Sequence, residues 1–371
     1  MLYLKLFNRK KVGKEEMGML PEKRKKLDMG LNSDDLENNQ GHKVKVPDLV
    51  IKKARKLLNK GAISVSLIGS MARGEVHEGS DIDLLVVMLE KEEAYYDGQM
   101  STRINRTAVH KGYIIDEIYA PVSALLFDNI TPELEWAVSE AVPIENKEEG
   151  VFGEIQEQIR EMFFTPERIS GRSKIYEKRI EKWTGNARIS LEKGDEDTTI
   201  LWLIMAMEEE VRNFVNLRGC NPQPSRLIPT LRETSQYTLQ HFASILNLRE
   251  MGDTIIQTFK EMINTGQKLC SRVDTNRFTG PEATMTELIG NSLTPIHYKK
   301  RIAHYEKTDM MTAQYLALNY LLRPLNTPSR ISFVKKLGKK ISLRRVVGSA
   351  TKCLTKLKDF RTAVQKVSNK S

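Results

Sequence analysis

The sequence predicts an α+β protein: a small mixed β-sheet domain, then an all-α helical domain, then a basic C-terminal helical tail. Short apolar runs with strand-like spacing lie between residues 63 and 144, separated by polar turns. From residue 151 to about 325, apolar residues instead recur at helical spacing. Beyond residue 330 this spacing continues among many Lys and Arg residues. These patterns divide the chain into four parts, residues 1–46, 47–150, 151–329 and 330–371.

The composition is that of a globular protein with basic ends. A chain of 371 residues can form two domains with a core each, and its three widely separated cysteines indicate reduced thiols in a cytoplasmic protein. It has no run of about 18 consecutive apolar residues, so no transmembrane segment is expected. Residues 1–26 carry nine Lys or Arg against three Glu, and residues 330–371 carry thirteen against one Asp. We therefore expect contact with a polyanion, if any, at the ends.

The elements of the first half follow from their end signals. Residues 1–46 mix basic runs with polar residues and are expected to be mostly disordered. Asp48 is predicted to cap a helix that ends at Gly61, and Thr131 to cap another that begins at Pro132. We expect strands at 63–68, 82–88, 104–109, 113–120 and 141–144, with the third and fourth forming a hairpin, and a charged helical segment around 90–96.

The second half is expected to hold helices at 173–192, 198–217, 236–248, 254–270 and 309–322, with Pro-rich breaks at 222–224 and 324–328. In the tail, apolar residues between 333 and 341 and between 354 and 367 predict two amphipathic basic helices that separate near Gly348. Such helices serve several purposes, and three interpretations stay open: contact with RNA, contact with an acidic membrane surface or protein, or a solvated appendage.

Residues 63–88 carry the strongest chemical signal. An apolar run ends at Gly69-Ser70, and ten residues later Asp81-Ile82-Asp83 leads into a second apolar run. Since side chains alternate along a strand, Asp81 and Asp83 project to one side while Ile82 points to the other. Two carboxylates on one side can share a divalent ion, and a Gly-Ser turn lets backbone N–H groups approach a phosphate. The stretch therefore predicts a site for Mg²⁺ and a nucleotide.

A third acidic position lies on the strand expected at 113–120. Asp116 and Glu117 are neighbours there, so they lie on opposite faces of the strand and only one can join Asp81 and Asp83. We prefer Asp116, because an apolar pair precedes it and Ile118 and Tyr119 follow. Glu117 remains open as the alternative.

The motif resembles the signature of the nucleotidyltransferases of the DNA polymerase beta superfamily. The match is Gly69-Ser70, ten residues, then Asp81-Ile82-Asp83-Leu84, and it includes Ala72-Arg73-Gly74 and Ser80, which recur in the minimal and antibiotic-modifying branches. The resemblance covers roughly residues 47–150. The helical remainder is similar to the kanamycin- and lincosamide-type enzymes only in its layout.

This resemblance implies an enzyme that moves a nucleoside monophosphate from a nucleoside triphosphate, with ATP as the first candidate, to an acceptor hydroxyl and releases pyrophosphate. Two Mg²⁺ ions, or Mn²⁺ in their place, would be held by Asp81, Asp83 and the third carboxylate, which would also accept the acceptor's proton. The nucleotide would be bound by Gly69 N–H, the Ser70 hydroxyl, Arg73 and Ser80.

Several alternatives stay open at this point. Arg73 could pair with Glu75 or Glu78 instead of a phosphate, and Glu208–Glu210 could orient a cationic acceptor or form a solvated helix face. The acceptor could be a small hydroxylated molecule, which fits a two-domain layout, or an RNA 3′ end, which fits the basic tail, or a protein side chain. A catalytically silent relative that binds nucleotide or RNA is the alternative to an enzyme.

Overall fold

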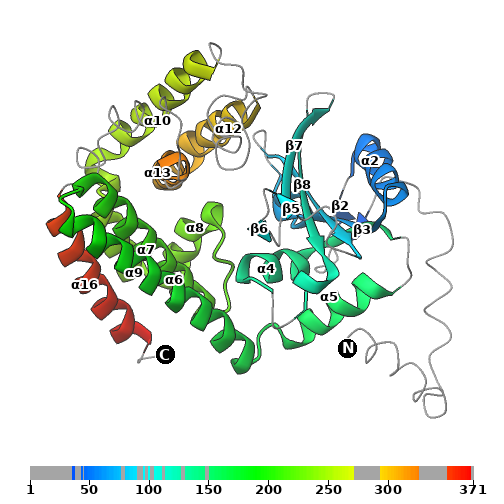
Figure 1. The fold of residues 1–371 in the computed structure, drawn as a ribbon, viewed down its shortest axis with the longest axis horizontal. Helices are drawn as coiled ribbons and strands as arrows, with labels where there is room; N and C mark the ends of the chain where they lie inside the picture. The colour runs from blue at the N-terminus through cyan, green and yellow to red at the C-terminus, as the bar shows by residue number, and fades with distance from the viewer. Residues whose placement is uncertain are drawn as a thin grey trace.

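The structure is a computed structural model, and it describes residues 36–37, 43–44, 46–76, 80–89, 95–96, 99–100, 104–110, 113–126, 130–146, 150–270, 293–325 and 349–368. Figure 1 shows a β-sheet with its covering helices on one side of the molecule and a group of helices on the other. The predicted α+β class is confirmed, with the strands in the first part of the chain and helices throughout the second.

A five-stranded sheet with the order β7-β8-β4-β3-β9 forms the centre of the first part. The parallel pairing of β4 with β8 and the antiparallel pairing of the other neighbours make it a mixed sheet, as predicted. The expected hairpin is β7–β8. The strands are β3 (Ala62–Ile68), β4 (Ile82–Met88), β7 (Ile104–His110), β8 (Tyr113–Pro121) and β9 (Val142–Asn146).

Both faces of this sheet are covered by helices. Alternate residues of β4 divide between the two faces, so Leu84 and Val86 pack in one cluster and Leu85 and Val87 in the other. The first cluster includes the apolar side of α2 (Asp48–Asn59), and the second includes α4 (Pro132–Glu140) and α5 (Val151–Met162). The near-continuous apolar run of β4 thus fits a strand that is buried on both faces.

The ends of these helices follow local signals with one correction. Thr131 caps α4 by accepting a hydrogen bond from Leu134 N at 3.4 Å, and Pro132 is the first helical residue, as predicted. The cap position of α2 is Pro47 and not Asp48, which lies in the first turn and makes no capping hydrogen bond. A carboxylate in the first turn is still favoured by the helix dipole.

The core of the first part begins earlier than expected, and one further prediction was wrong. The short strands β1 (Leu36–Glu37) and β2 (Lys43–Val44) pair, and Val44 and Val46 are buried, so the core begins within the segment expected to be mostly disordered. Most of residues 1–46 lies outside the described residues. Within the expected charged helix around 90–96, Tyr95–Tyr96 instead forms strand β5, which pairs with β6 (Gln99–Met100). The aromatic pair favours strand over helix.

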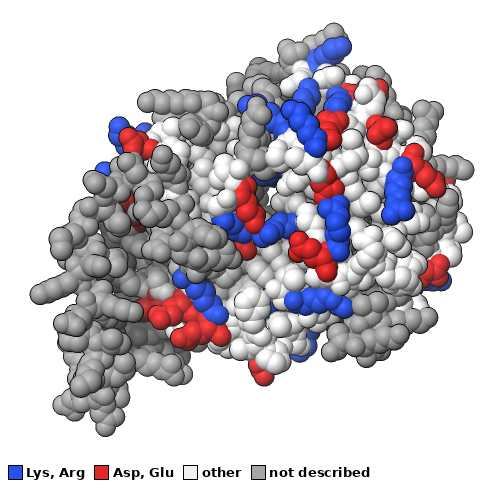
Figure 2. Space-filling model, turned by 180° about the vertical axis from the view of Figure 1, so that it is seen from behind, with Lys and Arg blue, Asp and Glu red and all other residues white. Residues whose placement is uncertain are grey.

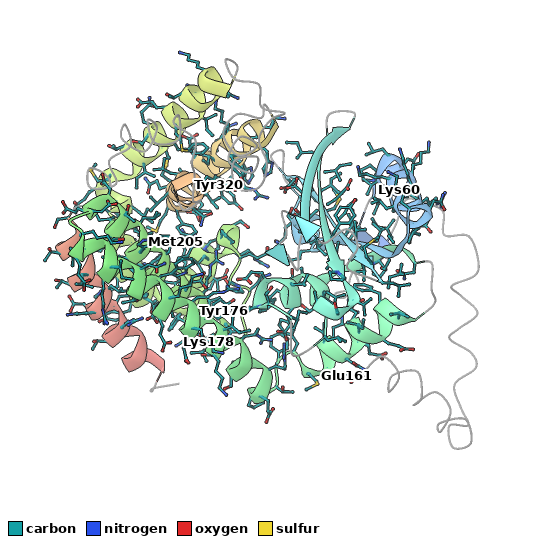
Figure 3. The ribbon with its side chains drawn as sticks, in the orientation of Figure 1. Lys60, Glu161, Tyr176, Lys178, Met205 and Tyr320 are labelled. Atoms are coloured by element: carbon teal, nitrogen blue, oxygen red, sulfur yellow. The ribbon has the colours of Figure 1, made fainter. Side chains whose placement is uncertain are left out.

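The second part is a body of packed helices. Buried Phe214, Phe242 and Phe259 belong to one large apolar cluster among its described residues. Figure 3 labels Tyr176, Lys178 and Met205 in this body. The Tyr176 side chain is buried, whereas Lys178, two residues later on the same helix, is exposed to solvent. Its helices are α6 (Pro166–Glu192), α7 (Glu196–Leu217), α8 (Pro224–Thr234), α9 (Gln236–Ile245), α10 (Leu248–Cys270), α12 (Leu293–Thr308), α13 (Met310–Leu325) and α16 (Ala350–Ser368).

Helices α5, α8 and α12 were not among those predicted from the sequence. Pro224 was interpreted as part of a break, but it is the first residue of α8, where its missing N–H would have no helical partner anyway. Helix α12 was not among the expected helices either. Charged Lys299, Lys300 and Arg301 interrupt its apolar pattern. This omission matters, because α12 contacts β7 and reaches the candidate site.

Helix α16 lies in the segment predicted as a basic tail. Its buried Leu357 and Phe360 belong to the main helical core, where α16 packs against α7 and α9. The ring of Phe360 lies 6.3 Å from that of Phe242. The second amphipathic helix of the tail is therefore part of the helical body, and the first, expected at 333–341, lies outside the described residues. Among the described helices, none has the length and apolar character needed to cross a membrane.

Candidate active site

Three aspartates meet at one end of the sheet. Asp83 on β4 and Asp116 on β8 are direct partners in the register of the parallel pair, and Asp81 lies just before β4. Carboxylate oxygens of all three lie within 4.8 Å of one another. The face they share carries Leu85 and Ile118 further along the same strands, under α4 and α5. The acids thus occupy the end of that face, beyond its apolar cover.

Glu117 lies on the other face of β8. There it forms an ion pair with Lys53 of α2, and its carboxylate accepts a hydrogen bond of 2.6 Å from the Tyr119 hydroxyl. The alternation of the strand separates it from Asp81 and Asp83. The structure therefore brings Asp116, and not Glu117, to the two aspartates.

The Gly69-Ser70 turn lies directly against Asp83. Helix α3 (Gly69–Ala72) begins there, and Gly69 has a φ of +70°, a conformation that favours glycine. A Cβ at this position would overlap the Asp83 carboxylate, so glycine is also required by space. The Ser70 hydroxyl is buried without a hydrogen-bond partner among the described residues, although buried hydroxyls normally have one. Ser80, also predicted to bind nucleotide, directly precedes Asp81.

Arg73 is paired with carboxylates. Its Nε donates to Glu75 at 2.8 Å and its Nη1 to Glu140 at 2.8 Å. Burial alone would lower the pKa of this guanidinium, but Glu140 and Glu75 raise it. The pairing with Glu75 is one that we expected if Arg73 is not a phosphate ligand, while Glu78 lies outside the described residues. A phosphate contact of Arg73 stays a prediction.

Helix α12 brings Arg301 and His297 to Asp81. Arg301 Nη2 donates to Asp81 Oδ1 at 2.9 Å, and His297 Nε2 lies 3.0 Å from Asp81 Oδ2. Arg301 also reaches the Tyr320 hydroxyl on α13, at 3.3 Å from its Nη1. Both oxygens of one predicted metal ligand thus face side chains from the helical body.

The charges at this contact stabilise each other. Burial alone would raise the pKa of Asp81, but Arg301 and His297 hold it well below its usual value. Burial would likewise lower the pKa of Arg301, but Tyr320, Asp81 and Asp83 raise it. The carboxylate and the guanidinium are therefore both charged, and the attraction extends from Arg301 to Asp83.

The sequence contains a signal for this pair that was not used. His297 and Arg301 are four residues apart, so on a helix they lie on the same face. Had residues 293–308 been predicted as a helix, a histidine and an arginine on one face would have been visible. Which acid it meets could not be found in this way, because Asp81 is 220 residues from Arg301 in sequence.

The acidic run Glu208–Glu210 does not form a solvated face, so that interpretation was wrong. Glu208 accepts hydrogen bonds from Arg212 at 2.5 Å and Asn319 at 3.0 Å, and its exposed fraction is only 9%. Glu209 pairs with Arg179 at 3.4 Å, and Glu210 pairs with Arg361 of α16. All three carboxylates stabilise contacts within the protein, which also leaves them less suited to orient a cationic acceptor.

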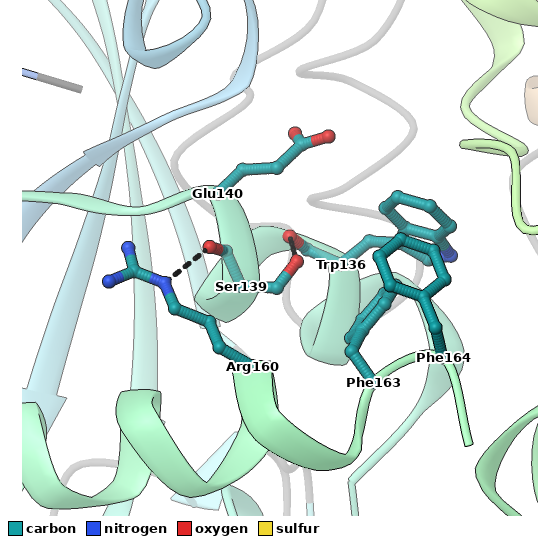
Figure 4. A pocket seen from close by; sticks show the side chains of 6 residues that line it. All are labelled: Trp136, Ser139, Glu140, Arg160, Phe163 and Phe164. Carbon is teal, nitrogen blue, oxygen red and sulfur yellow. Dashed lines mark hydrogen bonds between the residues drawn. The ribbon is translucent and has the colours of Figure 1, made fainter. Parts of the chain in front are cut away.

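A pocket of about 500 Å³ lies apart from the aspartates, at the ends of α4 and α5. Figure 4 shows three aromatic rings on one side of it, with the Arg160 side chain on the other, where Arg160 Nε donates to the Ser139 carbonyl oxygen at 2.9 Å. Its lining residues are Trp136, Ser139, Glu140, Arg160, Phe163 and Phe164.

The match to a protein family agrees with the site. Residues 50–152 match a family described as the nucleotidyltransferase domain. A solved structure to which the chain is similar is a nucleotidyltransferase-like protein from Exiguobacterium sibiricum, with a TM-score of 0.34, 13% sequence identity, and coverage of 54% of this chain and 68% of that one. No curated protein matches the chain. Residues 50–152 are therefore a nucleotidyltransferase domain of the DNA polymerase beta type, and the chain is a transferase that moves a nucleoside monophosphate.

Proposed function

We propose that this protein is an Mg²⁺-dependent nucleotidyltransferase that uses a nucleoside triphosphate, with ATP as the first candidate, and a small molecule with a hydroxyl group as acceptor. The observation that carries the proposal is the approach of Asp81, Asp83 and Asp116 to within 4.8 Å beside the Gly69-Ser70 turn. A triad of carboxylates next to a glycine turn that opens a helix can serve both a metal and a phosphate.

The donor set fits the proposed metal. Carboxylate oxygens are the ligands that Mg²⁺ prefers, and Mn²⁺ accepts the same set. In the proposed site Asp81, Asp83 and Asp116 hold two such ions, which supply charge neutralisation to the attacking and leaving oxygens when bound. The unpartnered Ser70 hydroxyl supports a ligand at the adjacent turn, since a phosphate oxygen would satisfy it.

The chain's own residues have the following proposed roles. The Gly69 N–H and the Ser70 hydroxyl bind the β- and γ-phosphates, and Ser80 and Arg73 add further contacts to the nucleotide. Asp116 accepts the proton of the acceptor hydroxyl. The acceptor oxygen then forms a bond to the α-phosphorus while the bond from that phosphorus to the pyrophosphate oxygen breaks, and pyrophosphate leaves.

The arrangement around the aspartates supports a small acceptor. Helix α12 contacts β7 and reaches Asp81, so the helical body forms a second wall beside the site. On the rear face, the described Lys and Arg side chains lie among Asp and Glu side chains and do not gather into one basic area (Figure 2). Long nucleic acids bind chiefly through continuous basic surfaces. The basic stretches at residues 1–26 and 330–348 lie outside the described residues.

A transfer assay tests the proposal. The protein is incubated with Mg²⁺, each of four α-labelled nucleoside triphosphates, and acceptors of three classes: hydroxylated small molecules, RNA oligonucleotides, and proteins. We expect labelled small molecule and an equal amount of pyrophosphate, both abolished in an Asp81→Ala, Asp83→Ala double variant. Labelled RNA or labelled protein would overturn the proposed acceptor class, and activity equal to the native rate in the double variant would overturn the mechanism.

A further inference from the structure

In the contact between α12 and Asp81, a predicted metal ligand is occupied by the protein's own Arg301 and His297. Both carboxylate oxygens of Asp81 face α12, at 2.9 Å from Arg301 and 3.0 Å from His297. A metal ion bound to Asp81 would share these oxygens with both side chains and lie beside the positive charge of Arg301, so charge repulsion favours the release of that contact. The structure therefore sets metal binding against an internal ion pair.

Arg301 cannot simply be left without a partner when this happens. A guanidinium keeps its charge in proteins, and only 18% of the Arg301 side chain is exposed. A largely buried charge that loses its counterion is strongly unfavourable. Its Nε already lacks a hydrogen-bond partner among the described residues, so the group has a donor to spare. An anion that arrives with the metal would resolve the imbalance.

We propose that Arg301 is a triphosphate-binding residue supplied by the helical body, and that it is held on Asp81, together with His297, until a nucleotide arrives with its metal. This inference rests on the proposed function, in which Asp81 is a metal ligand. According to this inference, metal and nucleotide bind cooperatively. The metal displaces the Arg301 guanidinium from Asp81, and the guanidinium then binds the triphosphate of the nucleotide.

The surroundings of Arg301 fit an exchange of partners without movement of the helix. Tyr298 on α12 and Tyr320 on α13 stack at 3.8 Å between ring centroids, with an angle of 7°, which fixes the two helices to each other. Arg301 Nη1 contacts the same Tyr320 through its hydroxyl. Arg301 Nη2 can thus exchange the Asp81 carboxylate for a phosphate while the Tyr320 hydroxyl keeps the guanidinium in position. The several planar N–H donors of arginine also suit a phosphate better than the one nitrogen by which His297 contacts Asp81.

The first test measures Mn²⁺ binding without nucleotide, from the electron paramagnetic resonance signal of the free ion. In Arg301→Gln and in His297→Gln, we expect Mn²⁺ to bind at least about fivefold more tightly than in the native protein. Arg232→Gln is the matched control, because Arg232 pairs with Asp309 at 2.9 Å in the same helical body and should leave Mn²⁺ affinity unchanged. Equal or weaker Mn²⁺ binding in both site variants would overturn the inference.

The second test measures binding of inorganic pyrophosphate in EDTA. Asp81→Asn releases Arg301 and should increase pyrophosphate affinity, whereas the double variant Asp81→Asn, Arg301→Gln should lose that increase. Both variants lack the Asp81 charge, so a difference in their pyrophosphate affinity is due to Arg301. Equal pyrophosphate affinity in the two would show a merely structural arginine and would overturn the inference. Circular dichroism melting identifies any variant that fails to fold, and Arg301→Met, which removes the charge and keeps a long side chain, then replaces Arg301→Gln in the Mn²⁺ titration.

These outcomes are separate from the fate of the proposed function. If the native protein transfers no nucleotide in the assay above, the proposed function fails, but the Mn²⁺ and pyrophosphate measurements can still be made. If transfer occurs and pyrophosphate affinity does not depend on Arg301, only this inference fails.

Discussion

Arg301 and Asp81 are 220 residues apart in the sequence, yet Arg301 Nη2 lies 2.9 Å from Asp81 Oδ1. This contact joins the helical body to the end of the sheet where Asp83 and Asp116 lie. The site is therefore shared between the two parts of the chain: the acids lie on β4, just before it and on β8, and Arg301 and His297 lie on α12. The predictions below test the acids, the turn beside them, and the contacts that hold α4 against the helical body.

Asp116 and Glu117 offer a comparison of neighbouring carboxylates. We expect Asp116→Asn to lower the transfer rate by about 100-fold or more, because the proposed metal ligand and proton acceptor is lost. Glu117→Gln should keep most of the rate, since Glu117 contacts Lys53 and Tyr119 on the other face. Steady-state pyrophosphate release measures both. A large loss in Glu117→Gln alone, with intact folding, would reverse the assignment.

Gly69 is expected to tolerate no side chain. Gly69→Ala places a Cβ against the Asp83 carboxylate and also adopts a φ of +70°, so both stability and transfer should fall. Gly194→Ala is the matched control, because its φ is +71° but no atom lies within 4 Å of the added Cβ. Gly194→Ala should lower the free energy of unfolding only by the backbone strain, about 1–2 kcal/mol, and should leave the transfer rate unchanged. Urea unfolding and the transfer assay compare them, and equal effects of the two substitutions would contradict the overlap.

Glu135 joins α4 to α6 through a fully buried carboxylate. It lies 2.6 Å from Arg168 Nη2 and 3.0 Å from Arg172 Nη1, and its own side chain is 0% exposed. Because Glu135→Gln leaves two arginines without their counterion, we expect it to lower the free energy of unfolding by about 3–5 kcal/mol. The exposed pair Arg55–Glu145 provides the control, and Arg55→Gln should cost at most about 1 kcal/mol. Urea unfolding measures both variants, and a similar decrease in the free energy of unfolding for Glu135→Gln and Arg55→Gln would refute the role of burial.

Glu133 makes part of the stability depend on pH. Burial alone would raise its pKa, but Arg179 and Arg212 lower it from 4.5 to about 2. Since the folded pKa lies below the unfolded one, this stability is present above pH 4.5 and is lost as the pH falls towards 2. Glu133→Gln cannot titrate, so the difference in unfolding free energy between native protein and variant should shrink over that range. A difference that stays constant with pH would contradict the ion pair as its source.

The local pattern of the sequence was sufficient for the catalytic strands. The alternation of Asp81, Ile82 and Asp83 correctly placed both aspartates on one side, and the hairpin and the Thr131 cap also follow from nearby residues. These features depend on backbone geometry over a few residues. The sequence therefore determined the β3–α3–β4 motif and with it the nucleotidyltransferase domain.

Only the tertiary structure decided what meets these aspartates. The sequence favoured Asp116 over Glu117 but left Glu117 open, because the choice depends on the register that sets Asp83 opposite Asp116. The partners of Asp81 depend on how α12 packs against the sheet, and those of Glu208 on the position of α13. Register and helix packing are fixed by contacts between residues far apart in the chain, which no local periodicity contains.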